Sequence, residues 1–237
     1  MLKITNFSKT YKGGKKAVDN LNLIVENGDI FGFIGHNGAG KTTTIRAIVG
    51  ALDFEEGEIK INNISIKENP VLCKSMTAYI PDNPDIYEYL TGIQYLNFVG
   101  DIFKINKEKR ENLIKKYADL FELTDNLGDL ITSYSHGMKQ KLVIISALIH
   151  EPKLIIMDEP FVGLDPKASH TLKNIMHELC EQGNSIFFST HVLDVAEKLC
   201  NKIAIIKNGK LSAFGNISEV IGNKSLEDVF LELPDNE

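Results

Sequence analysis

The sequence G-H-N-G-A-G-K-T at residues 35–42 decides the fold. It matches the pattern G-x-x-x-x-G-K-[ST], in which a glycine-rich turn presents backbone amides to the phosphates of a nucleotide. Residues 29–34 before it (D-I-F-G-F-I) form a short apolar run typical of a strand, and residues 43–49 after it (T-T-I-R-A-I-V) have the spacing of a buried helix face. A chance glycine-rich turn would lack these flanking elements. The order of strand, turn and helix therefore predicts a nucleotide-binding protein.

The residues of this turn have separate expected roles. Gly35, Gly38 and Gly40 allow positive φ angles and close approach of the backbone, so that successive N–H groups can form an anion nest at the start of the helix. Lys41 is expected to reach the outer phosphates, and the Thr42 hydroxyl to bind Mg²⁺, a hard cation that prefers oxygen ligands. The predicted phosphate site consists of Gly35, His36, Asn37, Gly38, Ala39, Gly40, Lys41, Thr42 and Thr43.

The composition favours a cytosolic α/β protein. With 237 residues, 43% of them hydrophobic, the chain can form one large domain, with or without a subdomain. Its net charge is −6 and it has no long basic stripe, so we expect no nucleic-acid partner. Three cysteines without C-x-x-C spacing favour reduced thiols over disulfides or zinc. The longest apolar run, residues 142–149, is far shorter than the ~18 residues that span a bilayer, and no signal peptide is visible.

The remaining pattern predicts a mixed order of strands and helices. Strands are expected at residues 2–7, 21–25, 58–66, 76–80, 153–158, 185–189, 203–206 and 210–213. Helices are expected after a Thr91-x-x-Gln94 capping box to about residue 103, and at residues 107–121, 139–149 and 165–181. Asn208-Gly209 indicates a type I′ hairpin turn, and a short helix is expected to close the chain.

This order divides the chain into three expected parts. Residues 1–84 are expected to hold an antiparallel β subdomain and the first part of the phosphate-loop core. Residues 85–149 would form a helical subdomain, and residues 150–237 would complete the core with the hairpin and the short helix. That short helix leaves no room for a large regulatory domain.

Two carboxylates follow the apolar strand at residues 153–158. Asp158 and Glu159 lie where ligands bind in open α/β sheets. Asp158 is expected to hold Mg²⁺ directly or through water, and Glu159 to polarise the water that attacks the γ-phosphate; the alternative is a solvated strand end. His191 follows the next strand at the same edge. A histidine there is more often a packing or capping residue, but the neighbouring Glu159 favours a catalytic role.

A second helix start carries small residues. The sequence S-H-G-M-K-Q at residues 135–140 precedes the helix expected from Lys139, and its glycine and serine leave the helix N-terminus free to face an anion. An ordinary serine cap with a tight glycine is the alternative.

With these motifs in this order, the chain resembles the ATP-binding subunit of an ABC transporter over essentially its full length. The resemblance implies an α/β P-loop NTPase (RecA-like) core with an antiparallel β subdomain and a helical insertion subdomain. It also implies that two subunits enclose two ATP molecules, each phosphate loop being completed by the signature helix of the opposite subunit. Ser135 and Gly137 match the signature S-G-G-Q and would contact the γ-phosphate in trans, whereas His136 and Met138 depart from it.

The resemblance assigns roles to further residues. Glu159 matches the catalytic glutamate and His191 the switch histidine, while Asp165 in G-L-D-P matches the loop that reports across the dimer. Tyr11 matches the aromatic residue that stacks on adenine; its alternative is packing at the end of the first strand.

One loop departs from the family pattern. The family usually has a glutamine after the strand at residues 76–80, where this chain has Pro81-Asp82-Asn83. Asp82 can offer an oxygen to Mg²⁺ but adds negative charge beside the phosphates, which predicts stronger metal dependence or a changed coupling step. Beyond it, Tyr87, Tyr89 and Leu90 belong either to the subdomain core or, as the resemblance implies, to a groove for a cytoplasmic helix of the membrane subunit.

The resemblance predicts a transport ATPase that uses ATP and Mg²⁺. ATP would close a homodimer and its hydrolysis would reopen it, driving a separate integral membrane permease at the cytoplasmic face of the membrane. The pattern looks most like bacterial two-component exporters. The alternatives are a soluble ABC ATPase that acts on ribosomes or nucleic acid, and a nucleotide-regulated interaction protein with little turnover.

Overall fold

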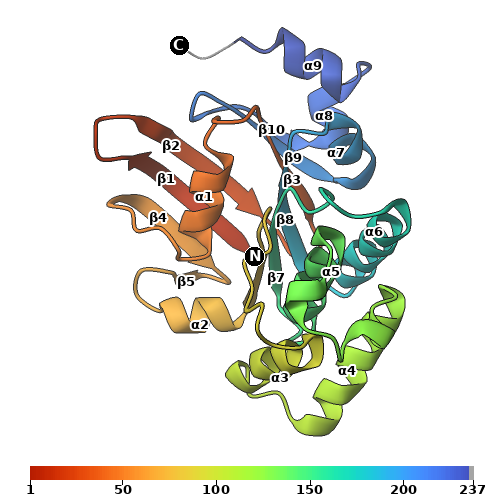
Figure 1. Ribbon diagram of the computed structural model, residues 1–237. Helices are drawn as coiled ribbons and strands as arrows, with labels where there is room; N and C mark the ends of the chain where they lie inside the picture. Colours follow the sequence, from red (N-terminus) through yellow and green to blue (C-terminus); the bar gives the residue numbers. More distant parts are fainter. Residues whose placement is uncertain (235–237) are drawn as a thin grey trace.

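The strand before the phosphate loop lies inside a six-stranded sheet. The computed structural model describes residues 1–234, and within that range the sheet has the order β10-β9-β3-β8-β7-β6 (Figure 1). All neighbouring pairs are parallel except β9 and β10. The strands are β3 (Ile30–Ile34), β6 (Thr77–Ile80), β7 (Leu154–Asp158), β8 (Ser185–Thr190), β9 (Lys202–Lys207) and β10 (Lys210–Asn216).

A second sheet is antiparallel, as its alternating sequence predicts. It has the order β2-β1-β4-β5 and consists of β1 (Leu2–Thr10), β2 (Lys16–Val25), β4 (Glu56–Ile61) and β5 (Ile64–Ser65). Its buried face packs against helix α1 (Lys41–Ile48) and against β3, so that Leu2, Ile45 and Phe31 share one apolar core. Burial of such side chains fixes α1, and therefore the loop before it, between the two sheets.

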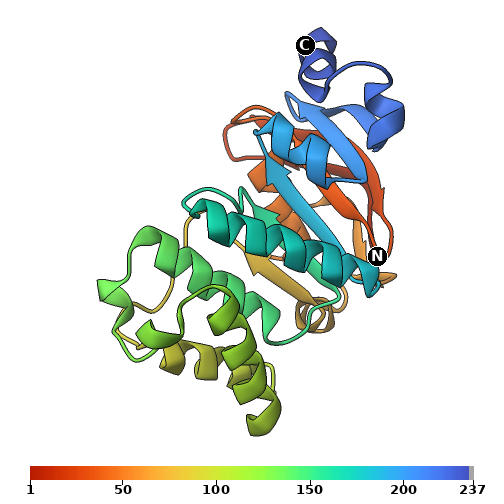
Figure 2. The same ribbon diagram turned by 90° about the vertical axis from the view of Figure 1, so that its right-hand side faces the viewer.

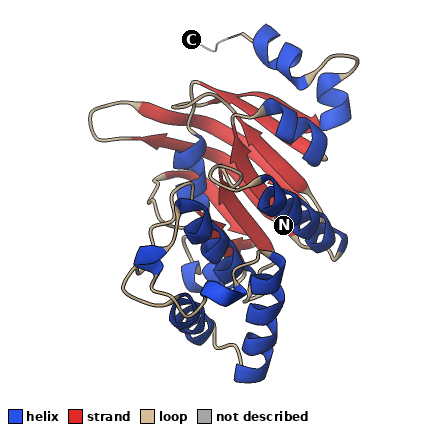
Figure 3. Ribbon diagram, turned by 45° about the vertical axis from the view of Figure 1, so that its right-hand side comes forward, coloured by secondary structure: helices blue, strands red, loops and turns tan. Residues whose placement is uncertain are grey.

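Helices α3 (Gly92–Ile102), α4 (Lys107–Leu120) and α5 (His136–Leu148) gather at one end of the molecule (Figures 2 and 3). The capping box at Thr91 and the Asn106 cap confirm two of the predicted helix starts. Single 3₁₀ turns at Thr124–Asn126 and Ile131–Ser133 connect α4 to α5. The predicted start of the third helix at Lys139 was wrong, because Ser135 already caps α5 by accepting a hydrogen bond from Met138 N at 3.2 Å.

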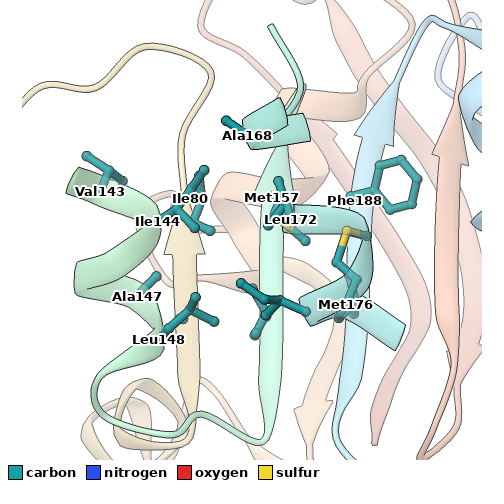
Figure 4. Close-up of a cluster of buried hydrophobic side chains, with 14 of the residues drawn as sticks. Ile80, Val143, Ile144, Ala147, Leu148, Met157, Ala168, Leu172, Met176 and Phe188 are labelled. Carbon is teal, nitrogen blue, oxygen red and sulfur yellow. The ribbon is translucent and has the colours of Figure 1, made fainter. Parts of the chain in front are cut away.

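Helix α5 and helix α6 (Pro166–Glu181) pack on the sheet near the ends of β6, β7 and β8. Figure 4 shows Val143 and Ile144 of α5 beside Ile80, and Leu172 and Met176 of α6 near Met157 and Phe188. Asp165 caps α6 by accepting a hydrogen bond from Ala168 N at 2.8 Å. Strands covered in this way are buried along their whole length, which explains their continuous apolar sequences.

The C-terminal part differs in detail from the prediction. Asn208 and Gly209 both have positive φ, as a type I′ hairpin turn requires. Helices α2 (Pro70–Ser75) and α7 (Leu193–Leu199) were not predicted, and two helices, α8 (Ile217–Ile221) and α9 (Leu226–Glu232), follow β10 in place of one. These helices are short, so few turns of apolar periodicity announce them.

Two further expectations from the sequence concern the cysteines and the lengths of the helices. Cys73, Cys180 and Cys200 are buried free thiols, which confirms the expectation of reduced cysteines. Within residues 1–234, no helix has both the length and the apolar character needed to cross a bilayer.

Candidate functional site

The loop between β3 and α1 needs its glycines for close backbone contacts. A Cβ on Gly35 would lie 2.5 Å from the Ile206 carbonyl oxygen, and one on Gly40 would lie 2.6 Å from the Ala17 carbonyl oxygen. Gly38 and Gly40 also have φ angles of +83° and +109°, which L side chains rarely adopt. Because a Cβ on Gly38 would meet no described atom within 4 Å, this part of the loop is open to a ligand.

Lys41 is buried at the start of α1 and interacts with its own loop. Its ammonium donates hydrogen bonds to the Gly35 carbonyl at 2.6 Å and the His36 carbonyl at 3.2 Å, and lies 3.8 Å from Glu159 Oε1. Burial lowers the pKa of Lys41, an effect that the charges of Glu159 and Asp158 oppose. A phosphate at the loop would supply negative charge that this buried cation can pair with.

Asp158 is held by two hydroxyl groups at the end of β7. Thr42 Oγ1 donates to Asp158 Oδ2 at 2.9 Å, and Ser189 Oγ donates to the other carboxylate oxygen. The side chain is almost fully buried. The Thr42 hydroxyl and the Asp158 carboxylate thus form a pair of oxygen ligands beside the phosphate loop, a donor set that fits Mg²⁺.

Glu159 has an unusual backbone conformation for a residue with a side chain. Its φ is +47°, in a region that costs a non-glycine residue about 1–3 kcal/mol. Its amide donates to the Ser189 carbonyl at 3.2 Å, which holds the turn in place. The side chain is only 15% exposed and its Oε1 lies 2.9 Å from His191 Nδ1. The two residues with predicted catalytic roles therefore contact each other.

A pocket of about 270 Å³ opens beside these groups. It is lined by Tyr11, Lys15, Ala17, Asn37, Gly38, Gly40, Lys41, Thr42, Thr43, Asp82, Asp158 and Glu159. The Tyr11 hydroxyl lies 3.2 Å from Thr43 Oγ1, and the Tyr11 side chain is 40% exposed and lines the pocket. The Asp82 carboxylate accepts a hydrogen bond from Asn83 N at 2.9 Å and can still turn toward the pocket.

The signature residues do not line this pocket. Ser135 is exposed at the start of α5. His136 contacts the loop after Glu159, since a Cβ on Gly163 would lie 2.5 Å from the histidine ring. A Cβ on Gly137 would lie 2.9 Å from the Gly163 carbonyl oxygen. In the described chain, the start of α5 is therefore joined to residues 159–165 and is separate from the phosphate pocket.

An ion pair strengthens this junction. Lys141 Nζ lies 2.8 Å from Asp165 Oδ2, and the hydrogen bond from Lys141 lowers the pKa of Asp165, with a further contribution from the Ala168 amide. Asp165 thus connects α5 to the first turn of α6.

Sequence reasoning missed four residues of the site: Ser189, Lys141, Lys15 and Ala17. The signal for Ser189 was present, since it ends the strand expected beside β7 and pairs in register with Asp158. Lys141 lies on the helix that begins at Ser135, but its partner is 24 positions away in the sequence and no local pattern joins them. Lys15 becomes a pocket residue only through the turn between β1 and β2.

A larger groove of about 530 Å³ lies between the end of β6 and the helices α3 and α5. It is lined by Arg46, Ala51, Tyr79, Pro81, Asp82, Asn83, Asp85, Ile86, Tyr95, Val143 and Ser146. In the loop that follows Asp85, the side chains of Tyr87 and Tyr89 are 61% and 91% exposed. The alternative that these tyrosines belong to the subdomain core is therefore wrong, although Leu90 does pack against the core.

Known proteins share this sequence and this fold. A family profile described as ABC transporter matches residues 18–162. The chain is 38% identical over 222 residues to the ABC-type transporter ATP-binding protein EcsA of Bacillus subtilis, covering 92% of this chain and 90% of that protein. It is also 38% identical over 212 residues to the bacitracin transport ATP-binding protein BcrA of Bacillus licheniformis, covering 89% and 68%. A solved ATP-binding subunit of an ABC transporter superposes with a TM-score of 0.93 at 33% identity, covering 98% of both chains.

Proposed function

The chain belongs to the ABC transporter family as an ATP-binding subunit, and from that premise we propose that it hydrolyses ATP to drive a separate membrane permease, most simply an exporter. The observation that carries the proposal is the position of Glu159. Its carboxylate lines the phosphate pocket, lies 2.9 Å from His191 Nδ1 and lies 3.8 Å from the Lys41 ammonium. A carboxylate so placed can accept a proton from water beside a bound γ-phosphate.

The other pocket residues would bind and neutralise the nucleotide. The amides of residues 38–43 and Lys41 would receive the phosphates, and Tyr11 would stack on the base at the rim. Thr42 and Asp158 would hold Mg²⁺, which would supply positive charge to the phosphates, and Asp82 would offer a further oxygen at the same wall. His191 would hold the Glu159 carboxylate in place through its amide, which donates to Glu159 Oε2 at 3.4 Å, and through its ring nitrogen beside Oε1.

A second copy of the chain would complete each site. Ser135 and Gly137 lie at a helix start outside the pocket of their own chain, where they are available to an ATP molecule bound by a partner. Asp165 forms an ion pair with Lys141 of α5 and caps α6, so a movement of α5 when the two subunits close would be transmitted to α6 through Asp165. We propose that residues 85–149 move as a helical unit between the two parts of the core, residues 1–84 and 150–237.

The groove beside Asp82 is the proposed permease contact. Aromatic and apolar side chains line it between the core and α3 together with polar ones such as Arg46 and Asp85, and Tyr87 and Tyr89 extend the apolar surface next to it. Such a surface fits a short amphipathic helix from the cytoplasmic side of a membrane protein. The subunit would then lie at the cytoplasmic face of the membrane. The bacitracin transport protein among its relatives supports a transport role.

Purification of the intact complex from membranes tests this proposal. We expect a partner with several apolar membrane-spanning helices and faster ATP hydrolysis by the complex than by the isolated subunit. Tyr89→Glu is expected to weaken partner recovery, whereas Leu120→Glu, at an exposed apolar residue of α4 away from the groove, should not. Recovery with ribosomes and no membrane protein would favour a soluble ATPase instead.

A further inference from the structure

Helix α9 touches the phosphate loop, although more than 180 residues separate them in the sequence. The rings of Phe230 and His36 lie 4.7 Å apart, centroid to centroid, in an edge-to-face arrangement. Phe230 is only 5% exposed, whereas His36 is an exposed residue of the loop. Such aromatic contacts are favourable beyond the apolar area that they bury.

This contact falls on the least supported part of the loop. Gly35 and Gly40 are backed by neighbouring carbonyl groups, and the Ala39 carbonyl accepts a hydrogen bond from Gly209 N at 3.0 Å. Residues 36–38, in contrast, are exposed, and a Cβ on Gly38 would meet no atom of the described chain within 4 Å. Within the loop, the His36 carbonyl accepts a hydrogen bond from Ala39 N at 3.1 Å, and the ring of Phe230 adds a side-chain contact that restrains residues 36–38 from outside the loop.

Helix α9 itself is held on two sides. Lys207 Nζ donates to the Leu233 carbonyl at 2.6 Å, at the end of the helix, and also lies 5.1 Å from the centre of the Phe230 ring. At the start of the helix, Leu226 N donates to Glu197 Oε2 of α7 at 2.7 Å. Figure 1 shows α9 at the same end of the molecule as α7 and α8. Since α7 begins two residues after His191, α9 joins the phosphate loop to the element that follows the switch histidine.

We propose that Phe230 positions the phosphate loop for ATP through His36, which makes helix α9 a part of the nucleotide site. The His36 carbonyl is also an acceptor for Lys41, so a shift of this residue changes where the ammonium points. Loss of the ring contact lets residues 36–38 sample conformations in which their amides do not face the phosphates. Affinity for ATP then falls, while Glu159 and His191, which lie outside the loop and contact each other, stay in place.

A double-mutant cycle on ATP affinity tests this proposal in the isolated full-length subunit. Phe230→Leu in the parent chain is expected to raise the Kd of a fluorescent ATP analogue about two- to tenfold, the range of one aromatic pair, with little change in kcat. In a His36→Ala background the same substitution should add almost nothing. Leu231→Ala, at a residue of α9 that is 72% exposed, is the matched control.

Two outcomes of the cycle overturn the proposal. An equal rise in Kd in both backgrounds means that Phe230 merely packs α9, and an unchanged Kd in the parent chain means that the contact has no effect on binding. If the parent itself does not bind ATP, the proposed ATPase function fails, and this result is distinct from both. The role of Phe230 rests on the proposed ATP binding alone, and it is the same for any permease and any direction of transport.

Hydrogen exchange gives a measurement with Phe230 intact, in case Phe230→Leu does not fold. By linkage, a helix that raises ATP affinity is itself stabilised by ATP to the same extent. The amides of residues 226–233 should exchange more slowly when a non-hydrolysable ATP analogue saturates the site, and this slowing should be lost in His36→Ala at saturation. Equal slowing in parent and variant contradicts a link through His36.

Discussion

Two helix starts in this protein, both of which we propose to contact the phosphates of ATP, have unlike surroundings. The start of α1 has a complete set of partners within its own chain: Lys41, the Thr42 hydroxyl and the Asp158 carboxylate all meet beside one pocket. The start of α5 has a serine and a glycine that are turned away from that pocket, and its contacts go to residues 163–165. One chain thus carries two half-sites of different chemistry.

The two helix starts differ in what their contacts determine: charge at α1 and position at α5. The half-site at α1 holds charge: one buried cation faces two carboxylates, and a phosphate with its metal ion changes this balance. At the α5 half-site the contacts fix the position of the helix start, because the ion pair of Lys141 with Asp165 joins α5 to the loop that follows Glu159. A nucleotide bound between the two halves of different copies would connect chemistry in one subunit to movement in the other.

Removing the proton acceptor at the α1 half-site should have the largest effect. Glu159→Gln keeps the size of the side chain but cannot accept a proton, so turnover is expected to fall about 10²–10⁴-fold while ATP stays bound and dimers accumulate. Steady-state ATPase rates and light scattering with ATP measure both effects. Glu108→Gln, at an exposed acid of α4, is the control. A variant that turns over near the parental rate would refute the role given to Glu159.

The α5 half-site should be nearly as important to turnover, but in trans. Ser135→Ala is expected to leave ATP affinity of the monomer unchanged and to slow turnover about 10²–10³-fold, the effect of losing one donor at the reacting phosphate.

Mixing the two inactive variants shows whether Ser135 acts on the ATP of the opposite subunit or on the ATP of its own. In a mixed dimer of Ser135→Ala and Glu159→Gln subunits, one site has both an intact glutamate and an intact serine. If subunits pair at random, about a quarter of the parental rate should return, since half the dimers are mixed and each has one complete site. No recovery on mixing would mean that Ser135 acts on the nucleotide of its own chain, and would contradict the proposed role of the α5 half-site in trans.

The α1 half-site could be predicted from sequence because its chemistry is local. Eight consecutive residues form the loop, and the carboxylates follow a strand whose apolar run is visible by itself. The caps at Thr91 and Asn106 also depend on residues within one turn, and the structure shows both. The assignment of fold class from these signals agrees with the solved ATP-binding subunit.

The contacts between distant residues could not be predicted in the same way. The pairing of Lys141 with Asp165 and the contact of Phe230 with His36 depend on how α5, α6 and α9 pack, which no spacing in the sequence records. The same reason explains the three-residue error at the start of α5. Glycine is a poor helix former, but packing of the turn at Gly137 on Gly163 is close enough to need a glycine there.

Asp82 should have a moderate effect that concerns the metal ion. Its carboxylate lines the phosphate pocket beside Asp158 and Glu159, so it adds negative charge near the phosphates. Asp82→Gln removes that charge and keeps an oxygen, and the Mg²⁺ concentration for half-maximal hydrolysis is expected to change a few-fold. Titrating Mg²⁺ at fixed ATP, with and without the partner, measures it. Asp125→Asn, at an exposed acid outside both the pocket and the groove, is the control. Unaltered metal dependence and unaltered partner stimulation would remove Asp82 from the site.

The smallest effect should come from the ion pair that holds the α5 half-site. The Asp165 side chain is half exposed, so Lys141→Met is expected to lower the free energy of unfolding by under about 1 kcal/mol at pH 7. Because Lys141 lowers the pKa of Asp165 in the folded chain, its contribution is fully present above the ordinary aspartate pKa of about 3.9 and is lost as the pH falls below it. Urea unfolding of parent and variant should therefore give a difference at pH 7 that shrinks toward pH 3.5, with Lys3→Met as an exposed control. A difference that stays constant over this range would mean that Lys141 acts through packing of its alkyl chain, and that the close contacts of His136 and Gly137 with Gly163 hold the start of α5.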